Sequence, residues 1–470
     1  MPKLGIEQRS IDFVPHAERH GSARSLFAVW FAPNMQITTV VTGSLAVLVG
    51  LSLPWALLAI VVGNLFGATI MALHSAQGPK LGIPQMIQSR AQFGVYGATL
   101  PLILVLLMYI GFFASSAVLG GQALESWLGW PIVPAIIVTS AVCTIVAIVG
   151  YQLIHVMERI ISVIAALAFI YLSVRLLQAP GVGSTWHAGH FHFGIFLLVV
   201  AIASTWQITY APYVADYSRY LPADTPMSGP FWWTYWGSAI GSIWMMAFGS
   251  LAASIAVKTF GATPVAYVVD LAPGPVRWLF YIVLLLGVFA VNTMNLYGAF
   301  MSATTTLAAI FPMKLGAAAR TVFVLAVAVV STGVAILGYG NFVANFENFI
   351  LFLAYFLIPW TAINLADFYF VRRERYDIPS IFERNGLYGR WNGRALLAYA
   401  IGIVVEVPFV SSTFFTGWLV SHLGGADISW ILGLIVAGGV YLLLSGPIVR
   451  RENAWFAQRQ ATPASAESVG

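Results

Sequence analysis

Amide side chains inside long apolar stretches are the residues of this sequence best suited to binding chemistry. Gln207 lies in one such stretch, and Asn292 and Asn295 lie about one helical turn apart in another. An amide group both donates and accepts hydrogen bonds, and burying it without a partner is costly. We therefore expect Gln207 and Asn295 to bind an uncharged ligand with mixed donors and acceptors. The alternative for each amide is a hydrogen bond between packed helices.

Two prolines interrupt apolar stretches that would help to position these amides. The sequence Phe31-Ala32-Pro33-Asn34 breaks the first stretch, and Tyr210-Ala211-Pro212-Tyr213 breaks the sixth. Proline removes a backbone donor from a helix and frees a carbonyl group. Within a bilayer, unpaired backbone is tolerated only where protein or a water-filled cavity surrounds it. Two breaks five segments apart predict a transporter with two repeats of five helices.

The composition places most of the chain in a lipid bilayer. The 470 residues are 59% hydrophobic and only 8% charged, and the mean hydropathy is +0.85. Soluble proteins carry about 25% charged residues, so no soluble core could hide this apolar surface. The net charge of +5 comes from basic residues in loops between apolar stretches, so we expect no nucleic-acid partner. The single cysteine, Cys143, cannot form an internal disulfide.

Twelve stretches are long enough to cross the hydrocarbon core, which takes about 20 apolar residues. We predict an all-α integral membrane protein with twelve transmembrane helices. It would form a five-plus-five inverted repeat with broken helices 1 and 6, plus two C-terminal helices. The stretches begin near Ser25, Pro54, Thr99, Pro131, Met157, Phe193, Phe231, Val276, Thr321, Ala344, Ala395 and Ser429.

The loops predict the domain organisation and the orientation. The predicted parts are an N-terminal segment (1–24), a transport core (25–370), a loop (371–394), two accessory helices (395–450) and a tail (451–470). Nearly all Lys and Arg fall in loops on the same side as the two termini, so we expect both termini to be cytoplasmic. The N-terminal segment lacks the order of a cleaved signal peptide. We expect a multi-pass protein of the plasma or inner membrane, and the sequence indicates no oligomeric state.

Four sets of motifs resemble one known family. They are Gly78-Pro79-Lys80-Leu81-Gly82-Ile83-Pro84-Gln85-Met86 with Ser89-Arg90 and Phe93-Gly94, Pro212-Tyr213-Val214-Ala215-Asp216-Tyr217-Ser218-Arg219-Tyr220-Leu221-Pro222, Gly5-Ile6-Glu7-Gln8-Arg9, and Pro359-Trp360 with Asp367-Phe368-Tyr369 and Arg372-Arg373. Over nearly the whole chain, the sequence resembles the purine–cytosine permeases of the nucleobase:cation symporter-1 family. The resemblance implies a secondary active symporter that imports a nucleobase or related small heterocycle (cytosine, a purine, uracil or allantoin) by alternating access.

The resemblance also implies a substrate site between the first, third, sixth and eighth helices, where aromatic faces hold a planar ring and amides read its edge. The implied substrate-binding residues are Trp30, Phe31, Asn34, Phe112, Ser116, Trp206, Gln207, Thr209, Tyr210 and Asn295. Phe112 and Ser116 stand where relatives often carry a tryptophan and a glutamine or asparagine. These smaller side chains favour a larger ligand, or one that is recognised differently.

The resemblance bears on the coupling ion as well. Sodium-coupled members of the family carry hydroxyl residues about one turn before the asparagine that matches Asn295. Phe289 and Ala290 occupy these places here, so we expect coupling to protons rather than to sodium. The candidate coupling or gating residues are Asn292, Thr293, Asp216 and Arg219. The short spacing of the last two favours an ion pair that shapes a gate over a proton carrier.

A membrane enzyme or receptor with a transporter fold, or a carrier of another small polar solute, is the alternative function. An enzyme needs converging acid–base or metal-binding groups, yet the acidic residues of the apolar stretches are scattered. Glu406 is a second candidate proton carrier, although it lies outside the ten-helix core. The histidines at 187, 190 and 192 share one loop and match no zinc-site spacing. We expect no catalytic residue, no metal site and no cofactor.

Overall fold

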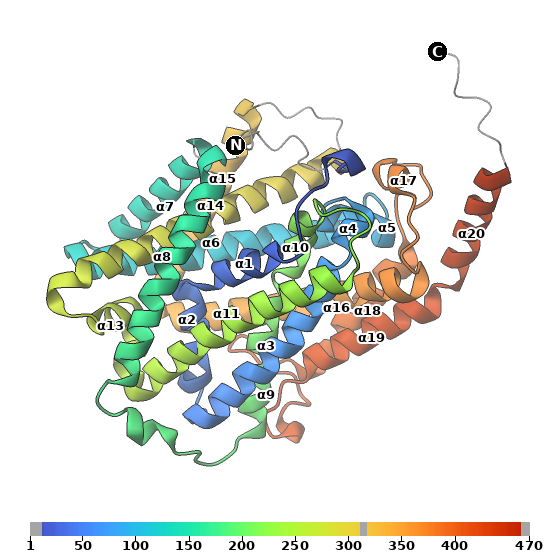
Figure 1. Cartoon of the computed structure of the whole chain (residues 1–470). Coiled ribbons are helices and arrows are strands. Elements are labelled where there is room, and N and C mark those ends of the chain that lie inside the picture. Colours follow the sequence, from blue (N-terminus) through green and yellow to red (C-terminus); the bar gives the residue numbers. More distant parts are fainter. Residues whose placement is uncertain (1–11, 150, 311–316, 462–470) are drawn as a thin grey trace.

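The computed structural model describes residues 12–149, 151–310 and 317–461. This part of the chain is a bundle of helices (Figure 1), and its β-type pairing is limited to one bridge between Ser411 and Thr416. The family motif at residues 5–9 and the outer ends of the predicted N-terminal segment and tail lie outside the described residues.

The first repeat contains five crossings and a helical connection after the second. Its crossings are α1 (Ser25–Phe31) with α2 (Ile37–Leu48), α3 (Leu53–Ser75), α6 (Thr99–Leu128), α7 (Ile132–Val149) and α8 (Tyr151–Leu177). A 3₁₀ turn that holds Pro33 and two bent residues separate α1 from α2. The connecting helices are α4 (Gly78–Leu81) and α5 (Gln85–Phe93).

The second repeat has the same plan. Its crossings are α9 (Phe193–Ile208) with α10 (Ala211–Ser218), α11 (Ser228–Ile255), α14 (Arg277–Ile310), α15 (Ala317–Gly338) and α16 (Phe342–Ala366). Thr209 and Tyr210 separate α9 from α10, and Pro212 lies in the first turn of α10. The connecting helices, α12 (Val257–Ala262) and α13 (Pro264–Asp270), again follow the second crossing.

Two further crossings follow the repeats. The C-terminal elements are a π-helical turn (Asp367–Val371), α17 (Ile378–Phe382), α18 (Gly393–Glu406), α19 (Ser429–Leu444) and α20 (Gly446–Ala461). The chain bends by 51° between α19 and α20. The second accessory helix thus ends before the expected boundary at residue 450. Pro447 is the reason, because proline is accommodated in the first turn of a helix and not in its interior.

The two repeats pack reciprocally. Helices α1 and α2 contact α11, whereas α9 and α10 contact α3, and α6 contacts α14. The first crossing of each repeat therefore packs on the second crossing of the other, and the third crossings meet. A pseudo-twofold axis between inverted repeats produces this exchange. The predicted five-plus-five architecture with two broken helices is confirmed.

The number of crossings follows from helix length and apolarity. Seven helical stretches of the described chain are long and apolar enough to span a bilayer, and the stretch Arg320–Val371 holds both α15 and α16. The broken α1–α2 pair and the helices α7, α18 and α19 complete the twelve predicted crossings. The outer helices present apolar side chains outward, as lipid contact requires: Leu167 on α8 and Leu337 on α15 are 62% and 90% exposed.

The ends of the bundle differ in the helices that they carry (Figure 1). We call the end with α4, α5 and α17 the α5 face, and the opposite end with α12 and α13 the α13 face. Helices α10 and α18 reach the α5 face, since both contact α5.

Candidate functional site

The break in the first crossing directs Asn34 toward neighbouring helices. Asn34 is fully buried, and its Nδ2 donates to the carbonyl oxygen of Trp30 at 2.8 Å. Its Oδ1 accepts hydrogen bonds from Trp206 Nε1 at 2.8 Å and from Ser242 Oγ at 2.7 Å. Asn34 therefore joins the broken first crossing to α9 and α11.

Gln207 belongs to the same network. Its Nε2 donates to Asn64 Oδ1 on α3 and to Ser242 Oγ on α11, both at 2.9 Å, and its Oε1 accepts from Ser238 Oγ at 2.5 Å. All of these groups are buried. In this structure Gln207 therefore bonds packed helices together, which is the alternative to substrate binding.

A cavity lies between the two breaks. It has a volume of about 40 Å³ and draws its lining from the first, third, sixth and eighth crossings. The lining residues are Gln36, Thr38, Phe112, Ser116, Trp206, Thr209, Tyr210, Tyr213, Val291 and Asn295. This volume holds a few water molecules, so a ring-sized ligand requires the surrounding side chains or helices to move apart.

The cavity gathers six of the ten residues that we predicted to bind substrate: Phe112, Ser116, Trp206, Thr209, Tyr210 and Asn295. Four lining residues were not among them: Gln36, Thr38, Tyr213 and Val291. Thr38 and Gln36 follow the first break, and Tyr213 follows the second. Because each break also exposes the residues on its far side, the proline positions were the signal that could have identified these three.

Aromatic rings form one wall of the cavity. The rings of Phe112 and Trp206 meet edge to face, with centroids 5.8 Å apart. Trp206 and Tyr210 meet in the same way at 6.1 Å, and so do Tyr210 and Tyr213 at 5.9 Å. Such a wall offers large, weakly directional contact to a planar ligand.

Apart from Val291, polar side chains occupy the remaining lining. The hydroxyl oxygens of Thr38 and Ser116 lie 3.3 Å apart, and either group could be the donor. Asn295 Nδ2 donates to Asn292 Oδ1 at 3.1 Å, and Asn292 Nδ2 donates to the carbonyl oxygen of Phe113 at 3.2 Å. Asn292 thus orients Asn295, whose Oδ1 accepts no hydrogen bond from the described residues and is available to a ligand.

Two aromatic residues that we predicted to bind substrate, Trp30 and Phe31, do not line the cavity. Trp30 is buried and meets the rings of Tyr210 and Tyr217 edge to face, at 5.6 and 5.2 Å. It supports Tyr210, which does line the cavity. Phe31 points elsewhere and stacks between Phe27 and Trp244, at 5.8 and 6.2 Å.

The candidate gating residues lie in two parts of the bundle: Thr293 within α14, and Asp216 and Arg219 at the α5 face. Thr293 Oγ1 donates to the carbonyl oxygen of Phe289 within its own helix at 2.7 Å. Asp216 and Arg219 lie on and just after α10 at the α5 face. Asp216 Oδ1 accepts from the backbone N–H of Gln85 at 2.8 Å, and Arg219 Nε donates to the carbonyl oxygen of Asp216 at 3.3 Å. Asp216 therefore joins α10 to the backbone of α5, and Arg219 joins it to the N-terminal segment, where its Nη1 donates to the carbonyl oxygen of Asp12 at 3.2 Å.

Glu406 and the loop histidines lie away from the cavity. Glu406 is 1% exposed between α18 and α19, and neither carboxylate oxygen bonds a described residue. The histidines at 187, 190 and 192 are exposed. Within the described ranges, no group of three or more His, Cys, Asp or Glu side chains could hold a metal ion.

The sequence matches known permeases. The model of the family described as "Permease for cytosine/purines, uracil, thiamine, allantoin" matches residues 13–433. The chain is 47% identical to the putative purine-cytosine permease YxlA of Bacillus subtilis, over 95% of this chain and 98% of that protein. It is 27% identical to the purine-cytosine permease fcyB of Emericella nidulans, over 94% of this chain and 89% of that protein.

The fold matches solved transporter structures. An inward-facing structure of Mhp1 aligns with a TM-score of 0.77 at 20% identity, covering 97% of this chain and 95% of that chain. A closed structure of Mhp1, a nucleobase-cation-symport-1 transporter with bromovinylhydantoin bound, aligns with a TM-score of 0.74 at 20% identity, covering 98% of both chains. The relatives are permeases rather than enzymes, as we predicted. This chain belongs to the permease family for cytosine/purines, uracil, thiamine and allantoin.

Proposed function

We propose that this protein is a secondary symporter that imports a nucleobase or a closely related uncharged heterocycle by alternating access. The observation that carries the proposal is the cavity between the two breaks, which combines an aromatic wall with a free amide oxygen. Stacking supplies affinity for a planar ring, and a few placed hydrogen bonds supply identity. The names of its relatives support the same class of substrate, because fcyB of Emericella nidulans is named a purine-cytosine permease.

The lining favours a neutral ligand. None of the ten lining residues is charged. A carboxylate or ammonium group would enter this cavity without a counter-charge, which is expensive at membrane depth. We propose that Asn295 Oδ1 accepts a hydrogen bond from a ring N–H, while Thr38 and Ser116 donate to or accept from the ring substituents.

We further propose coupling to protons. Phe289 and Ala290 provide no side-chain oxygen, and the hydroxyl of Thr293 is engaged by the backbone of its own helix. Asp216 and Arg219 would act at a gate, where Asp216 holds α10 against α5 and Arg219 bonds the backbone of the N-terminal segment at Asp12. The basic residues of the α5 face support a cytoplasmic position for this face and for both termini, in the plasma or inner membrane.

Counterflow in proteoliposomes tests this function. The purified protein is offered labelled purines, cytosine, uracil and allantoin, with sodium and pH gradients imposed separately. We expect saturable exchange of at least one heterocycle, and accumulation driven by the pH gradient but not by sodium. Exchange driven by sodium alone would contradict proton coupling. If the folded protein exchanges none of these heterocycles, the proposed substrate class is wrong.

The variant Asn295→Ala tests, in the same assay, whether the cavity is the binding site. Asn345→Ala is the matched control, because Asn345 is an exposed amide near the start of α16 that bonds the carbonyl oxygen of Gly338 and does not line the cavity. We expect exchange to fall by about 5- to 30-fold in Asn295→Ala, since a lost substrate hydrogen bond is worth about 1–2 kcal/mol. Exchange should be unchanged in Asn345→Ala. Equal exchange by both variants would remove Asn295 from the site.

A further inference from the structure

A second cavity lies on the α5 face, at the bend between α19 and α20. Its volume is about 110 Å³, larger than the cavity at the breaks. Arg394 and Gly393 from the start of α18 line one side, and Ile448 and Arg451 from the start of α20 line the other. We call it the α18–α20 pocket. The proposed transport function does not use it.

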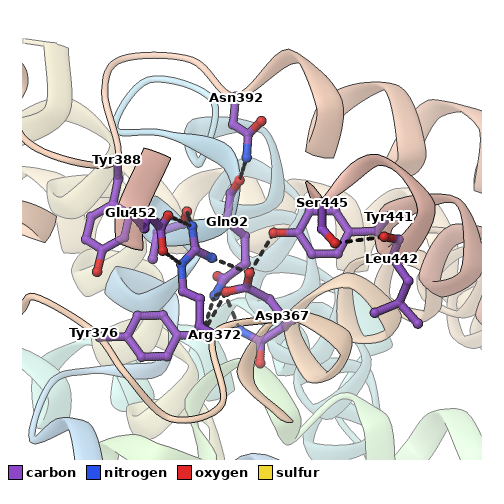
Figure 2. A network of polar contacts seen from close by, with 12 residues as sticks. Gln92, Asp367, Arg372, Tyr376, Tyr388, Asn392, Tyr441, Leu442, Ser445 and Glu452 are labelled. Carbon is purple, nitrogen blue, oxygen red and sulfur yellow. Dashed lines mark hydrogen bonds and ion pairs between the residues drawn. The ribbon is translucent and has the colours of Figure 1, made fainter. Parts of the chain in front are cut away.

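The pocket carries positive charge that the protein does not neutralise. Arg394 and Arg451 form no hydrogen bond or ion pair with any described residue, and no carboxylate lines the pocket. The acid next to Arg451 is turned away: Glu452 receives two hydrogen bonds from Arg372, at 3.0 Å from Nε and 2.7 Å from Nη2 (Figure 2). Arg372 is buried and also pairs with Asp367, so Glu452 is committed to that network.

Unpaired backbone donors add to this charge. Helix α18 begins at Gly393, and its cap residue Asn392 makes no side-chain cap. The Asn392 Nδ2 instead donates to the carbonyl oxygen of Gln92 at 2.6 Å (Figure 2). The first N–H groups of the helix therefore bond no described group, and the space at Gly393 is open, since an added Cβ would meet nothing within 4 Å. Such a helix start attracts anions, above all phosphate.

The pocket opens where the chain leaves the hydrocarbon layer. Leu443, in the last turn of α19, is 85% exposed, and Trp391 beside the pocket is 62% exposed. Tryptophan is enriched at the boundary between hydrocarbon and headgroups. Two arginines without a described partner and free N–H groups at that depth are placed where the phosphates of an adjacent leaflet would lie.

We propose that the α18–α20 pocket binds the phosphate of an anionic phospholipid headgroup. Arg394 and Arg451 hold the phosphate oxygens from two helices, and the N–H groups at the start of α18 complete the site. The lipid thereby connects α18 to α20 across the bend. A soluble phosphate has the same anionic oxygens, so the experiment must separate the two sources.

Native mass spectrometry of the full chain released from nanodiscs tests the site. Nanodiscs of phosphatidylcholine are compared with nanodiscs that contain phosphatidylglycerol. We expect the wild-type protein to retain phosphatidylglycerol selectively. Each lost charge should weaken binding about fivefold, so Arg394→Gln/Arg451→Gln should bind about 30-fold more weakly. Arg394→Lys/Arg451→Lys keeps the charge and should recover most of the binding.

Arg450→Gln is the matched control, because Arg450 is an exposed arginine on the same turn of α20 that does not line the pocket. We expect wild-type retention of lipid in this variant. An equal loss in Arg450→Gln would overturn the site in favour of general attraction to the membrane. Displacement of phosphatidylglycerol by millimolar inorganic phosphate, or equal retention of phosphatidylcholine, would also overturn the assignment to an anionic lipid. Size-exclusion profiles of all variants establish that each is folded.

Discussion

At the scale of single residues, the surroundings of an amide decide what it can do. Gln207 and Asn295 carry the same functional group at similar depth. Gln207 has both ends engaged, because its Nε2 and its Oε1 bond groups on α3 and α11. Asn295 engages only its Nδ2, and its Oδ1 remains available at the cavity. The first amide serves packing, and the second is suited to a ligand.

This contrast predicts opposite effects of two alanine substitutions. Gln207→Ala leaves Asn64 and Ser238 without their partner, and we expect it to lower the unfolding free energy by about 1–2 kcal/mol. Asn295→Ala removes only the single bond to Asn292, so it should lower stability less than Gln207→Ala does, and it should lower uptake. Thermal unfolding in detergent and uptake by proteoliposomes measure the two effects. A stable, inactive Gln207→Ala protein would return Gln207 to the substrate site.

The sequence could predict the neighbourhood of the site but not the direction of every side chain. Residues beside the two prolines do surround the cavity, as the breaks indicated. Trp206 lines the cavity, whereas its neighbour Gln207 faces α3 and α11. Helical periodicity separates these neighbours by about 100°, but it cannot tell which of them faces the cavity, because α9 is apolar on nearly every side.

At the scale of helices, the repeats depend on close backbone contact between α2 and α11. An added Cβ at Gly43 would lie 2.1 Å from the carbonyl oxygen of Met246, and one at Gly249 would lie 1.8 Å from that of Val40. Ser250 Oγ bonds the carbonyl oxygen of Gly43 across the same contact at 2.7 Å. Neither glycine can carry a side chain unless the helices separate.

Gly249→Ala should therefore destabilise the core. We expect a loss of about 1–3 kcal/mol, the usual range for overpacking a close contact. Gly439→Ala in α19 is the control, because its added Cβ meets nothing within 4 Å. Thermal unfolding of the two purified variants measures the difference. Equal stability of both variants would contradict the close approach of α2 and α11.

Helix α20 is attached through the network in Figure 2. Arg372 bonds Glu452 of α20, Asp367 and the carbonyl oxygen of Ala91 on α5. Burial alone would lower the pKa of Arg372, but Asp367, Tyr441 and Glu452 outweigh it and raise this pKa above its ordinary value. Arg372 therefore stays charged and holds α20 against the α5 face.

A double-mutant cycle tests this attachment. Arg372→Ala leaves two carboxylates without their cation and should cost about 3–5 kcal/mol, whereas Glu452→Ala leaves Arg372 paired with Asp367 and should cost less. The double variant should be more stable than the sum of the single losses predicts. Limited proteolysis of α20 and thermal unfolding provide the measurements. Strict additivity would mean that the two side chains do not interact.

The long helices could be predicted and the short ones could not. Expected and observed starts agree closely for most crossings, for example near Thr99, Phe193 and Ser429. Hydropathy identifies them because a whole crossing contacts lipid or other apolar helices. The helices α4, α5, α12, α13 and α20 are too short or too polar for this signal, because they lie at the ends of the bundle and pack on protein.

At the scale of the whole molecule, hydrogen bonds at the α5 face connect parts of both repeats. Arg19 Nη1 donates to the carbonyl oxygen of Pro79 at 2.6 Å, and Arg219 Nη1 donates to that of Asp12 at 3.2 Å. The N–H of Gln85 bonds Asp216 on α10. These contacts connect the N-terminal segment, the α4–α5 region and α10, which belong to different repeats. Alternating access requires them to separate when the cavity opens toward this face.

Cysteine accessibility can follow that separation. The single native cysteine, Cys143, is buried and is replaced by alanine as a background. Ser116→Cys then places one thiol in the cavity. A membrane-impermeant reagent is added to either side of oriented proteoliposomes. Alternating access predicts reaction from both sides at different times, and a bound heterocycle should protect the thiol from both.

Arg219→Gln should bias this equilibrium toward the state open at the α5 face. If the contacts of Arg219 contribute about 1.4 kcal/mol to closure, reaction from the α5 side rises about tenfold and reaction from the α13 side falls. Arg390→Gln is the control, because Arg390 is exposed at the same face and its side chain, among the described residues, bonds only Asn385 of its own loop. Faster reaction from both sides at once would indicate an open pore and contradict alternating access. Unchanged rates in a folded Arg219→Gln protein would mean that closure of the α5 face depends on the other contacts, those of Arg19 and Gln85.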